Sequence, residues 1–235
     1  MATIEMIKPA DIEKRSFEII EETIKARNIS VPFLMGNDGN EVNIKCKAGD
    51  PVLCRAITYR CIHTTADFDY AESLRFSENA VDIIKRCVAA GALIITDTNM
   101  ALTGINKKKL AEHNGEIYCF MADPEVAEKA KSNGTTRAYE AMKKAYGLHK
   151  ENASKPVIFA IGNAPTALIS LHKLYCEEGF RPDLIIGVPV GFVNVVVSKE
   201  LIMQTDIPYI INEGNKGGSA VAAAIVNAVL YSFDK

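Results

Sequence analysis

The chain has 235 residues, of which 48% are hydrophobic and 24% charged, and its formal net charge is -2. This balance is typical of a soluble globular protein with its own core, and it fits one domain spanning residues 1–235. The small net charge argues against nucleic acid as a partner, and no apolar run reaches the ~18 residues of a membrane helix.

The N-terminus, MATIEMIKPADIEK, carries acidic residues and lacks the apolar segment of a signal peptide, so we expect a cytoplasmic protein. The cysteines form no CxxC pair and show no zinc-ligand spacing, so no metal site is expected. Several of them lie in apolar runs. We interpret all six as reduced residues of the core: Cys46, Cys54, Cys61, Cys87, Cys119 and Cys176.

The first ninety residues are expected to be mainly helical. An amphipathic pattern predicts a helix over 11–28, and a second helix is predicted over 51–63. A third follows Ser77, a suitable N-cap, and continues to Ala90. Between the first two helices, residues 29–50 lack a helical period and carry an Asp-Gly turn, which indicates a hairpin-like excursion.

From Gly91 onward the pattern changes to alternating strands and helices. Five runs are short, β-branched and apolar on both faces, as buried parallel strands are: Ala92–Thr96, Glu116–Met121, Val157–Ile161, Leu184–Val188 and Ile207–Ile211. Helices are predicted at 124–132, 135–147, 166–178, 194–204 and 218–232. This alternation predicts a three-layer α/β/α fold with a mainly parallel sheet. Five strands favour the flavodoxin-like order 2-1-3-4-5 over a dinucleotide-binding fold.

In such a sheet, ligands bind outside the carboxyl ends of the strands. The last loop there, Lys216-Gly217-Gly218-Ser219, opens an aliphatic helix. Free N–H groups at a helix start, together with a lysine, can bind an anion. The alternative is a tight strand–helix turn in which Ser219 serves only as the N-cap. Neither GxGxxG nor a P-loop pattern is present, which lowers the expectation of nucleotide binding.

His63 differs from the other histidines because it ends the second predicted helix. A helix C-terminus favours the protonated imidazolium, which is the state that a general acid needs. A structural histidine is the alternative. Arg60 lies three residues earlier, so both side chains can face one pocket, although a surface ion pair is the alternative role for Arg60. We interpret Asp67 and Asp69 as a solvated turn.

Five segments, in order, resemble the precorrin-8X methylmutase family. They lie within a similarity that covers about residues 8–232: Ile62–Asp69, Thr96–Lys107, Gly162–Leu168, Gly187–Val193 and Lys216–Ser219. The resemblance implies a flavodoxin-like, homodimeric isomerase of cobalamin biosynthesis that needs no cofactor. Its reaction is a 1,5-sigmatropic shift of a methyl group from C-11 to C-12 of a tetrapyrrole. Two of the segments look more like the branch that uses cobalt-precorrin-8 than the metal-free branch.

The resemblance makes His63 the catalytic residue, as donor of a proton to a ring nitrogen. Protonation withdraws electron density from the conjugated system and lowers the barrier to migration, and a general acid contributes typically ~10²–10⁴-fold. The substrate carries acetate and propionate groups, which suit arginine and helix N-termini. The implied substrate-binding residues are Arg15, Ser16, Arg60, Thr64, Arg137, Asn163, Lys216 and Ser219.

The chain departs from the family pattern at four places. Asn215 stands where the family usually has Arg, Asn194–Val197 where it has Gly-Ala-Ala-Glu, and Ala138 where Ser is common, while 29–50 is longer than usual. The first two departures motivate a second hypothesis, a tetrapyrrole-binding paralogue without turnover. A third hypothesis is an unrelated α/β enzyme that binds a phosphorylated small molecule at the start of the last helix.

Overall fold

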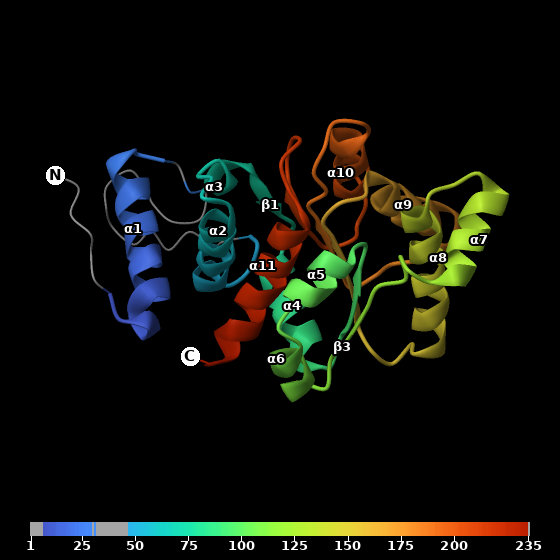
Figure 1. Ribbon diagram of the computed structural model, residues 1–235, viewed down its shortest axis with the longest axis horizontal. Helices are drawn as coiled ribbons and strands as arrows, with labels where there is room; N and C mark the ends of the chain where they lie inside the picture. Colours follow the sequence, from blue (N-terminus) through green and yellow to red (C-terminus); the bar gives the residue numbers. More distant parts are fainter. Residues whose placement is uncertain (1–6, 30, 32–46, 235) are drawn as a thin grey trace.

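The computed structural model describes residues 7–29, 31 and 47–234, so the excursion predicted over 29–50 lies mostly outside the described residues. A six-stranded sheet in the order β1-β6-β5-β4-β2-β3 forms the centre of the molecule (Figure 1). The strands are β1 (Leu74–Phe76), β2 (Leu93–Thr96), β3 (Glu116–Tyr118), β4 (Val157–Ile161), β5 (Leu184–Gly187) and β6 (Tyr209–Asn212).

The α/β fold is confirmed, but the prediction of five strands is wrong by one. The additional strand, β1, pairs antiparallel with β6 at the edge of the sheet, whereas the other pairs are parallel. The sheet is therefore mixed. β1 lies within the first ninety residues, which were expected to be helical. With only three residues it offers no period-2 pattern to recognise, and its pairing with β6 defines it.

Helices cover both faces of the sheet, because successive strand residues point to opposite sides. Ile158 of β4 joins one apolar core and Phe159 joins the other. The first core is closed by α2 (Pro51–Thr65), α4 (Ala80–Ala89) and α11 (Ser219–Tyr231). The second is closed by α8 (Arg137–Glu151), α9 (Pro165–Glu178) and α10 (Val195–Met203).

Two further helices lie at the ends of the molecule (Figure 1). At one end α1 (Ile12–Ala26) packs against α2, and at the other α7 (Pro124–Asn133) packs against α8. The predicted helices are thus confirmed with small changes in their bounds. The structure adds five short elements that the sequence did not indicate: α3 (Tyr70–Ser73), α5 (Asn99–Gly104), α6 (Lys107–Glu112) and 3-10 turns at Pro9–Asp11 and Ser232–Asp234.

The start of α4 differs from its prediction. Ser77 is not the N-cap, because Asn79 holds that position in a left-handed conformation with φ of 56°. The Ser77 hydroxyl instead accepts a hydrogen bond of 2.9 Å from the backbone N–H of Tyr209 in β6. Ser77 therefore ties the segment after β1 to the neighbouring strand.

The cysteines agree only in part with the expectation of a reduced core. Cys54, Cys61 and Cys87 are buried, and burial raises the pKa of Cys61 and of Cys87 to about 12. Cys119 is half-buried and Cys176 is exposed, which corrects the expectation for these two. Cys46 lies outside the described residues. No helix in the described ranges is both long and apolar enough to span a bilayer.

The loops after β4 and β6 approach each other more closely than side chains would allow. A Cβ atom added at Gly162 would lie 2.6 Å from the Cα of Ser219. One added at Gly217 would lie 2.1 Å from the carbonyl oxygen of Val188. Val188 follows β5, so glycine at these two positions allows the loops after β4, β5 and β6 to meet at the carboxyl end of the sheet.

Candidate active site

His63 lies in the last turn of α2 with its side chain exposed, and its ring centroid is 5.5 Å from that of Phe17 on α1. Arg60 approaches the same Phe17 ring at 5.3 Å and the Tyr231 ring at 4.8 Å. An ion pair of 2.7 Å with Glu13 completes its surroundings. The two side chains thus share one face of α2, as their spacing indicated, and Phe17 forms the common wall.

The end of α2 is well defined, which fixes where His63 leaves the helix. Asp50 caps its start by accepting hydrogen bonds from the N–H groups of Val52 and Leu53. At its other end Ala66 adopts the left-handed conformation, and its N–H donates to the Ile62 carbonyl at 2.7 Å. No hydrogen bond among the described residues engages the His63 ring.

Three other predicted residues lie beside His63. Thr64 follows it on α2 and is exposed. On α1, the Ser16 hydroxyl donates to the Ile12 carbonyl at 2.9 Å, and Arg15 forms a 3.2 Å ion pair with Glu22. The pairing of α1 with α2 therefore brings five of the predicted site residues together.

Lys216 belongs to the loop after β6 but contacts the segment that follows α2. Its ammonium nitrogen lies 2.5 Å from a carboxylate oxygen of Asp67 and 2.6 Å from one of Asp69. These hydrogen bonds raise the pKa of Lys216 above its usual range. Burial would raise the pKa of Asp67, but the Lys216 ammonium and the Asp69 N–H lower it below its ordinary value.

The two aspartates are therefore more than the solvated turn that the sequence suggested. They connect the end of α2 to the β6–α11 loop, and they outnumber the single positive charge of Lys216 between them. A substrate carboxylate that approached Lys216 would have to compete with both. The predicted role of the Lys216 side chain in binding an anion is correspondingly weaker, and that role stays a prediction.

The same loop is held from inside by a buried lysine that the sequence analysis left unassigned. Lys199 of α10 is only 1% exposed, and its ammonium donates to the carbonyls of Gly214 at 2.7 Å and Lys216 at 2.9 Å. Burial lowers the pKa of Lys199 to about 8. Its signal in the sequence is a lone cation inside the apolar stretch VVVSKELIM. The side-chain amide of Asn212 is a second donor to this loop, at 3.0 Å from the Lys216 carbonyl.

Ser219 is not the N-cap of α11, contrary to the interpretation as a simple capped turn. Gly218 holds the cap position and makes no side-chain hydrogen bond, and Ser219 is the first helical residue. Its hydroxyl lies 2.7 Å from that of Thr98, which caps α5. The hydroxyl of Ser219 thus joins the loops that follow β2 and β6.

Asn163 is exposed in the loop after β4, and the carboxylate of Asp97 holds this loop. Asp97 is fully buried and accepts backbone hydrogen bonds from Gly162, Asn163 and Ala164 at 2.8, 2.8 and 2.6 Å. Burial raises the pKa of Asp97, against the effect of these three donors. Asp97 directly follows the predicted strand Ala92–Thr96, but the sequence does not indicate its hydrogen-bond partners.

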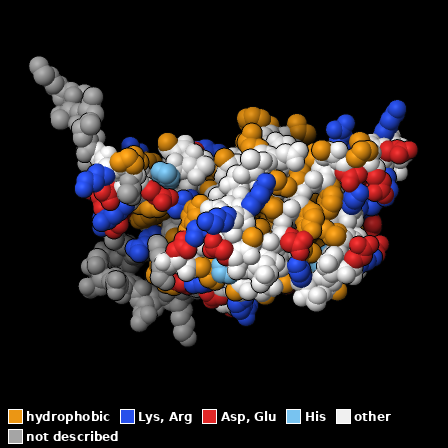
Figure 2. Space-filling view, turned by 60° about the horizontal axis from the view of Figure 1, so that its bottom comes forward, with side chains coloured by type: hydrophobic (Ala, Val, Ile, Leu, Met, Phe, Trp, Pro, Cys, Tyr) orange, Lys and Arg blue, Asp and Glu red, His pale blue; other side chains and the backbone are white. Residues whose placement is uncertain are grey.

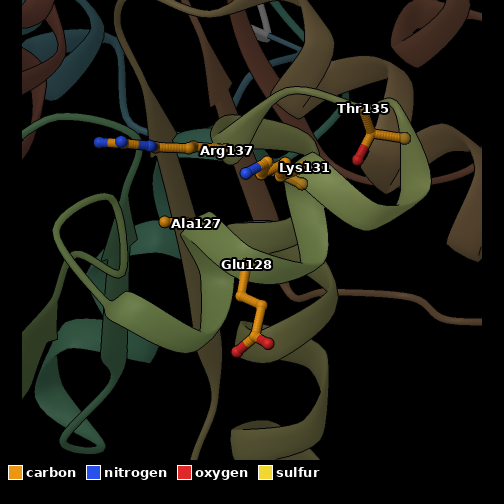
Figure 3. A pocket seen from close by; sticks show the side chains of 6 residues that line it. Ala127, Glu128, Lys131, Thr135 and Arg137 are labelled. Carbon is orange, nitrogen blue, oxygen red and sulfur yellow. The ribbon is translucent and has the colours of Figure 1, made fainter.

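Arg137 is the one predicted residue that lies apart. It begins α8, on the face of the sheet opposite α2, and lines an open cavity of about 550 Å³. Figure 3 shows Arg137 and Lys131 extending in the same direction, whereas Glu128 points away from them. A 2.7 Å contact between the hydroxyls of Thr136 and Thr166 ties the start of α8 to the start of α9. His63 and Arg137 are not neighbours within one chain.

The ion pairs also distinguish the residues beside His63 from Arg137. Charges of both signs are interspersed over the face that Figure 2 shows. Beside His63, each predicted cation has a carboxylate partner: Arg15 with Glu22, Arg60 with Glu13 and Lys216 with Asp67. Arg137 and Lys131 have no ion pair among the described residues. Nor do the described ranges contain a group of three His, Cys, Asp or Glu side chains that could hold a metal ion.

The chain is similar to known proteins over nearly its whole length. The family model of precorrin-8X methylmutase matches residues 11–232. The cobalt-precorrin-8 methylmutase of Leptospira interrogans is 43% identical over 185 residues, which are 76% of this chain and 83% of that protein. The cobalt-precorrin-8 methylmutase of Salmonella typhimurium is 39% identical over 224 residues, which are 95% of each chain.

A solved structure gives the same result. The precorrin-8x methyl mutase from Thermus thermophilus superposes with a TM-score of 0.74 at 32% identity, covering 94% of this chain and 96% of that one. The five ordered motifs, the α/β fold and these similarities agree. The chain therefore belongs to the precorrin-8X methylmutase family and is an isomerase of cobalamin biosynthesis.

Proposed function

We propose that the chain shifts a methyl group of cobalt-precorrin-8 from C-11 to C-12, giving a cobyrinate-type product, with His63 as the proton donor. The choice of the cobalt substrate is supported by the relatives at 43% and 39% identity, both named cobalt-precorrin-8 methylmutases. The observation that carries the catalytic assignment is the exposed His63 ring at the end of α2, which has no hydrogen bond among the described residues and has the Phe17 ring beside it.

In this proposal, proton transfer from the imidazole to a ring nitrogen draws electron density from the carbon framework and lowers the barrier to migration. The proton returns to the imidazole once the methyl group has moved, so no net change in protonation occurs. The rearrangement takes place within one bound molecule, and the protein's remaining task is to hold the macrocycle in a reactive orientation. The proposed reaction needs one general acid and one site that orients the macrocycle, without a cofactor.

The test uses cobalt-precorrin-8 under anaerobic conditions, with conversion followed by absorption spectroscopy. We expect the wild-type protein to convert the substrate, and His63→Ala to bind it with kcat lowered by ~10²–10⁴-fold, the contribution of a general acid. His172→Ala is the matched control, because His172 lies on α9 in the layer opposite α2. A wild-type protein without conversion would refute the proposed reaction, and a fully active His63→Ala variant would refute the role of His63.

The same proposal includes a cytoplasmic homodimer formed by single-domain chains. The partner is supported by the position of Arg137 and Lys131, which line a cavity on the face opposite α2 and have no ion pair within the described part of the chain. A two-fold axis repeats each surface on both subunits, so it can bring Arg137 of one copy toward His63 of the other. Arg137 and Lys131 would then bind the carboxylate groups of the substrate.

A tetrapyrrole-binding paralogue without turnover is the second candidate. It is favoured by Asn215, which stands where the family usually has Arg and whose side chain donates to the Gly191 carbonyl at 2.6 Å, so that it joins two loops of the protein. The experiment above separates the candidates. Tight binding of cobalt-precorrin-8 by the wild-type protein, with no spectral conversion, would favour the paralogue.

A further inference from the structure

Lys199 is a buried cation without a buried anion. Its side chain lies in the core beneath the β6–α11 loop, and among the described residues only carbonyl oxygens accept its hydrogen bonds. Burying a charge is costly unless it is paired and hydrogen-bonded. A packing role alone would be served better by an aliphatic side chain such as those of the neighbouring valines. The role of Lys199 must therefore lie in the backbone carbonyls that its ammonium binds.

The two carbonyls that Lys199 holds fix the direction of two peptide groups. In a trans peptide, the C=O of one residue and the N–H of the next point in opposite directions, and the described residues contain no cis peptide. Because the carbonyls of Gly214 and Lys216 point inward to the ammonium, the N–H groups of Asn215 and Gly217 point outward. Neither N–H has an acceptor among the described residues.

We propose that Lys199 is a positioning residue for substrate binding, which turns the N–H groups of Asn215 and Gly217 toward a carboxylate of the tetrapyrrole. This inference rests on the proposed function, because the carboxylate is that of an acetate or propionate group of the substrate. Two N–H groups on alternate residues match the two oxygens of one carboxylate. The loop backbone then binds the anion in place of the Lys216 side chain, which Asp67 and Asp69 already engage.

The charge of Lys199 also strengthens these donors. An ammonium bound to a carbonyl oxygen polarises the whole peptide group, so its N–H becomes a better donor. The positive charge stays inside the protein, where it favours an anion at the loop without exposing a second lysine to Asp67 and Asp69. A neutral side chain of similar length would lose both the hydrogen bonds and this polarisation.

The first test separates positioning from packing by kinetics. Lys199→Met keeps the length of the side chain but removes its donors, and we expect KM for cobalt-precorrin-8 to rise about tenfold or more with kcat within about threefold, equivalent to losing one good interaction. A merely structural role would lower the folded fraction, so the apparent kcat would fall and KM would not change. That result would overturn the inference.

The matched control is Ser198→Ala. Ser198 is the adjacent residue on α10 and is equally buried, but its hydroxyl donates at 2.8 Å to Val195 within the same helix rather than to the loop. We expect KM and kcat to stay within about twofold of wild type, since no loop contact is lost. If Lys199→Met does not fold, Lys199→Gln, which keeps a shorter donor group, should show an intermediate rise in KM.

A second measurement does not depend on turnover. Amide hydrogen exchange, read residue by residue by NMR, is compared with and without cobyrinate as the corrinoid probe. We expect the probe to slow exchange at Asn215 and Gly217 in the wild type and in Ser198→Ala, but not in Lys199→Met. Unchanged exchange in the wild type, or equal protection in Lys199→Met, would refute the inference. A failure of the proposed function would instead appear as bound substrate with no conversion by the wild-type protein.

Discussion

At the scale of single residues, the two buried charges near the site hold loops in opposite ways. The Asp97 carboxylate gathers three N–H groups of the loop after β4, whereas the Lys199 ammonium gathers two carbonyls of the loop after β6. Each satisfies backbone groups that the irregular loops leave unpaired at the end of a strand. Their burial makes both interactions stronger than they would be in water.

Lys199 makes the stability of the protein depend on pH. Its pKa is about 8 in the folded chain and ordinarily 10.5, so between these values the unfolded chain binds more protons than the folded one. Stability therefore rises with pH across this window, because the free energy of unfolding increases wherever the unfolded state holds more protons. Below about pH 8 the lysine is protonated in both states and its contribution is constant.

The measurement is urea denaturation of the wild type and Lys199→Met at several pH values. We expect the free energy of unfolding of the wild type, relative to the variant, to increase by about 2–3 kcal/mol from pH 8 to 10.5, at 1.36 kcal/mol per unit of pKa. The other lysines, tyrosines and cysteines titrate in both proteins, so their effects cancel. A constant difference across this range would show that Lys199 is not desolvated.

The same two residues show where prediction from sequence ends. Asp97 lies in the recognised segment Thr96–Lys107 and follows a predicted strand, whereas Lys199 lies in none of the five segments. The hydrogen bonds were not predictable, because Asp97 and Asn163 are 66 residues apart and Lys199 reaches its acceptors only after α10 has packed. Likewise, the pairing of Lys216 with Asp67 spans 149 residues, and no local pattern encodes it.

At the scale of elements, the sequence predicted best what hydrophobicity alone determines. β4 agrees residue for residue with its prediction, because Val157–Ile161 is a continuous apolar run between Pro156 and Gly162. β1 was missed because three residues at a sheet edge become a strand only through β6. Caps were the other error: Gly218 takes the place expected for Ser219, since the backbone conformation rather than the side chain determines the cap.

The contact between the β4 and β6 loops leads to a prediction for Gly162. In Gly162→Ala the new Cβ would lie 2.6 Å from the Cα of Ser219 and 2.9 Å from the Gly218 carbonyl, so the backbone must move. We expect the free energy of unfolding to fall by about 1–3 kcal/mol, as for other overpacked sites. KM should also rise, because the start of α11 shifts.

The control is a glycine substitution that we expect to change the free energy of unfolding in the opposite direction. Gly147 lies inside α8, and a Cβ there meets nothing within 4 Å. Gly147→Ala should raise the free energy of unfolding by about 0.5–1 kcal/mol, because alanine restricts the unfolded chain and favours a helix. Both variants are compared by urea denaturation. Equal stability of Gly162→Ala and the wild type would show that the two loops do not depend on this close approach.

At the scale of the whole molecule, the sheet separates the predicted site residues into two sets. The set with His63 lies on the side of α1 and α2, and Arg137 lies with α8 on the other side (Figure 1). A linear motif search joins these residues into one site, whereas the fold of one chain keeps them apart. The separation is understandable if each active site of the proposed homodimer takes Arg137 from the partner copy.

Mixing two inactive variants tests this arrangement. His63→Ala and Arg137→Ala homodimers should each have activity far below the wild type, since every site lacks one of the two residues. After subunits exchange, half of the dimers are mixed, and each mixed dimer has one site with both residues intact. Random exchange should therefore restore about 25% of the wild-type activity if a two-fold dimer shares its sites. Unmixed variants incubated in the same way are the control, and mass spectrometry of the intact dimers verifies the exchange. No recovery in verified mixed dimers would show that Arg137 acts with His63 of its own chain, whereas a fully active Arg137→Ala homodimer would show that Arg137 takes no part in the reaction.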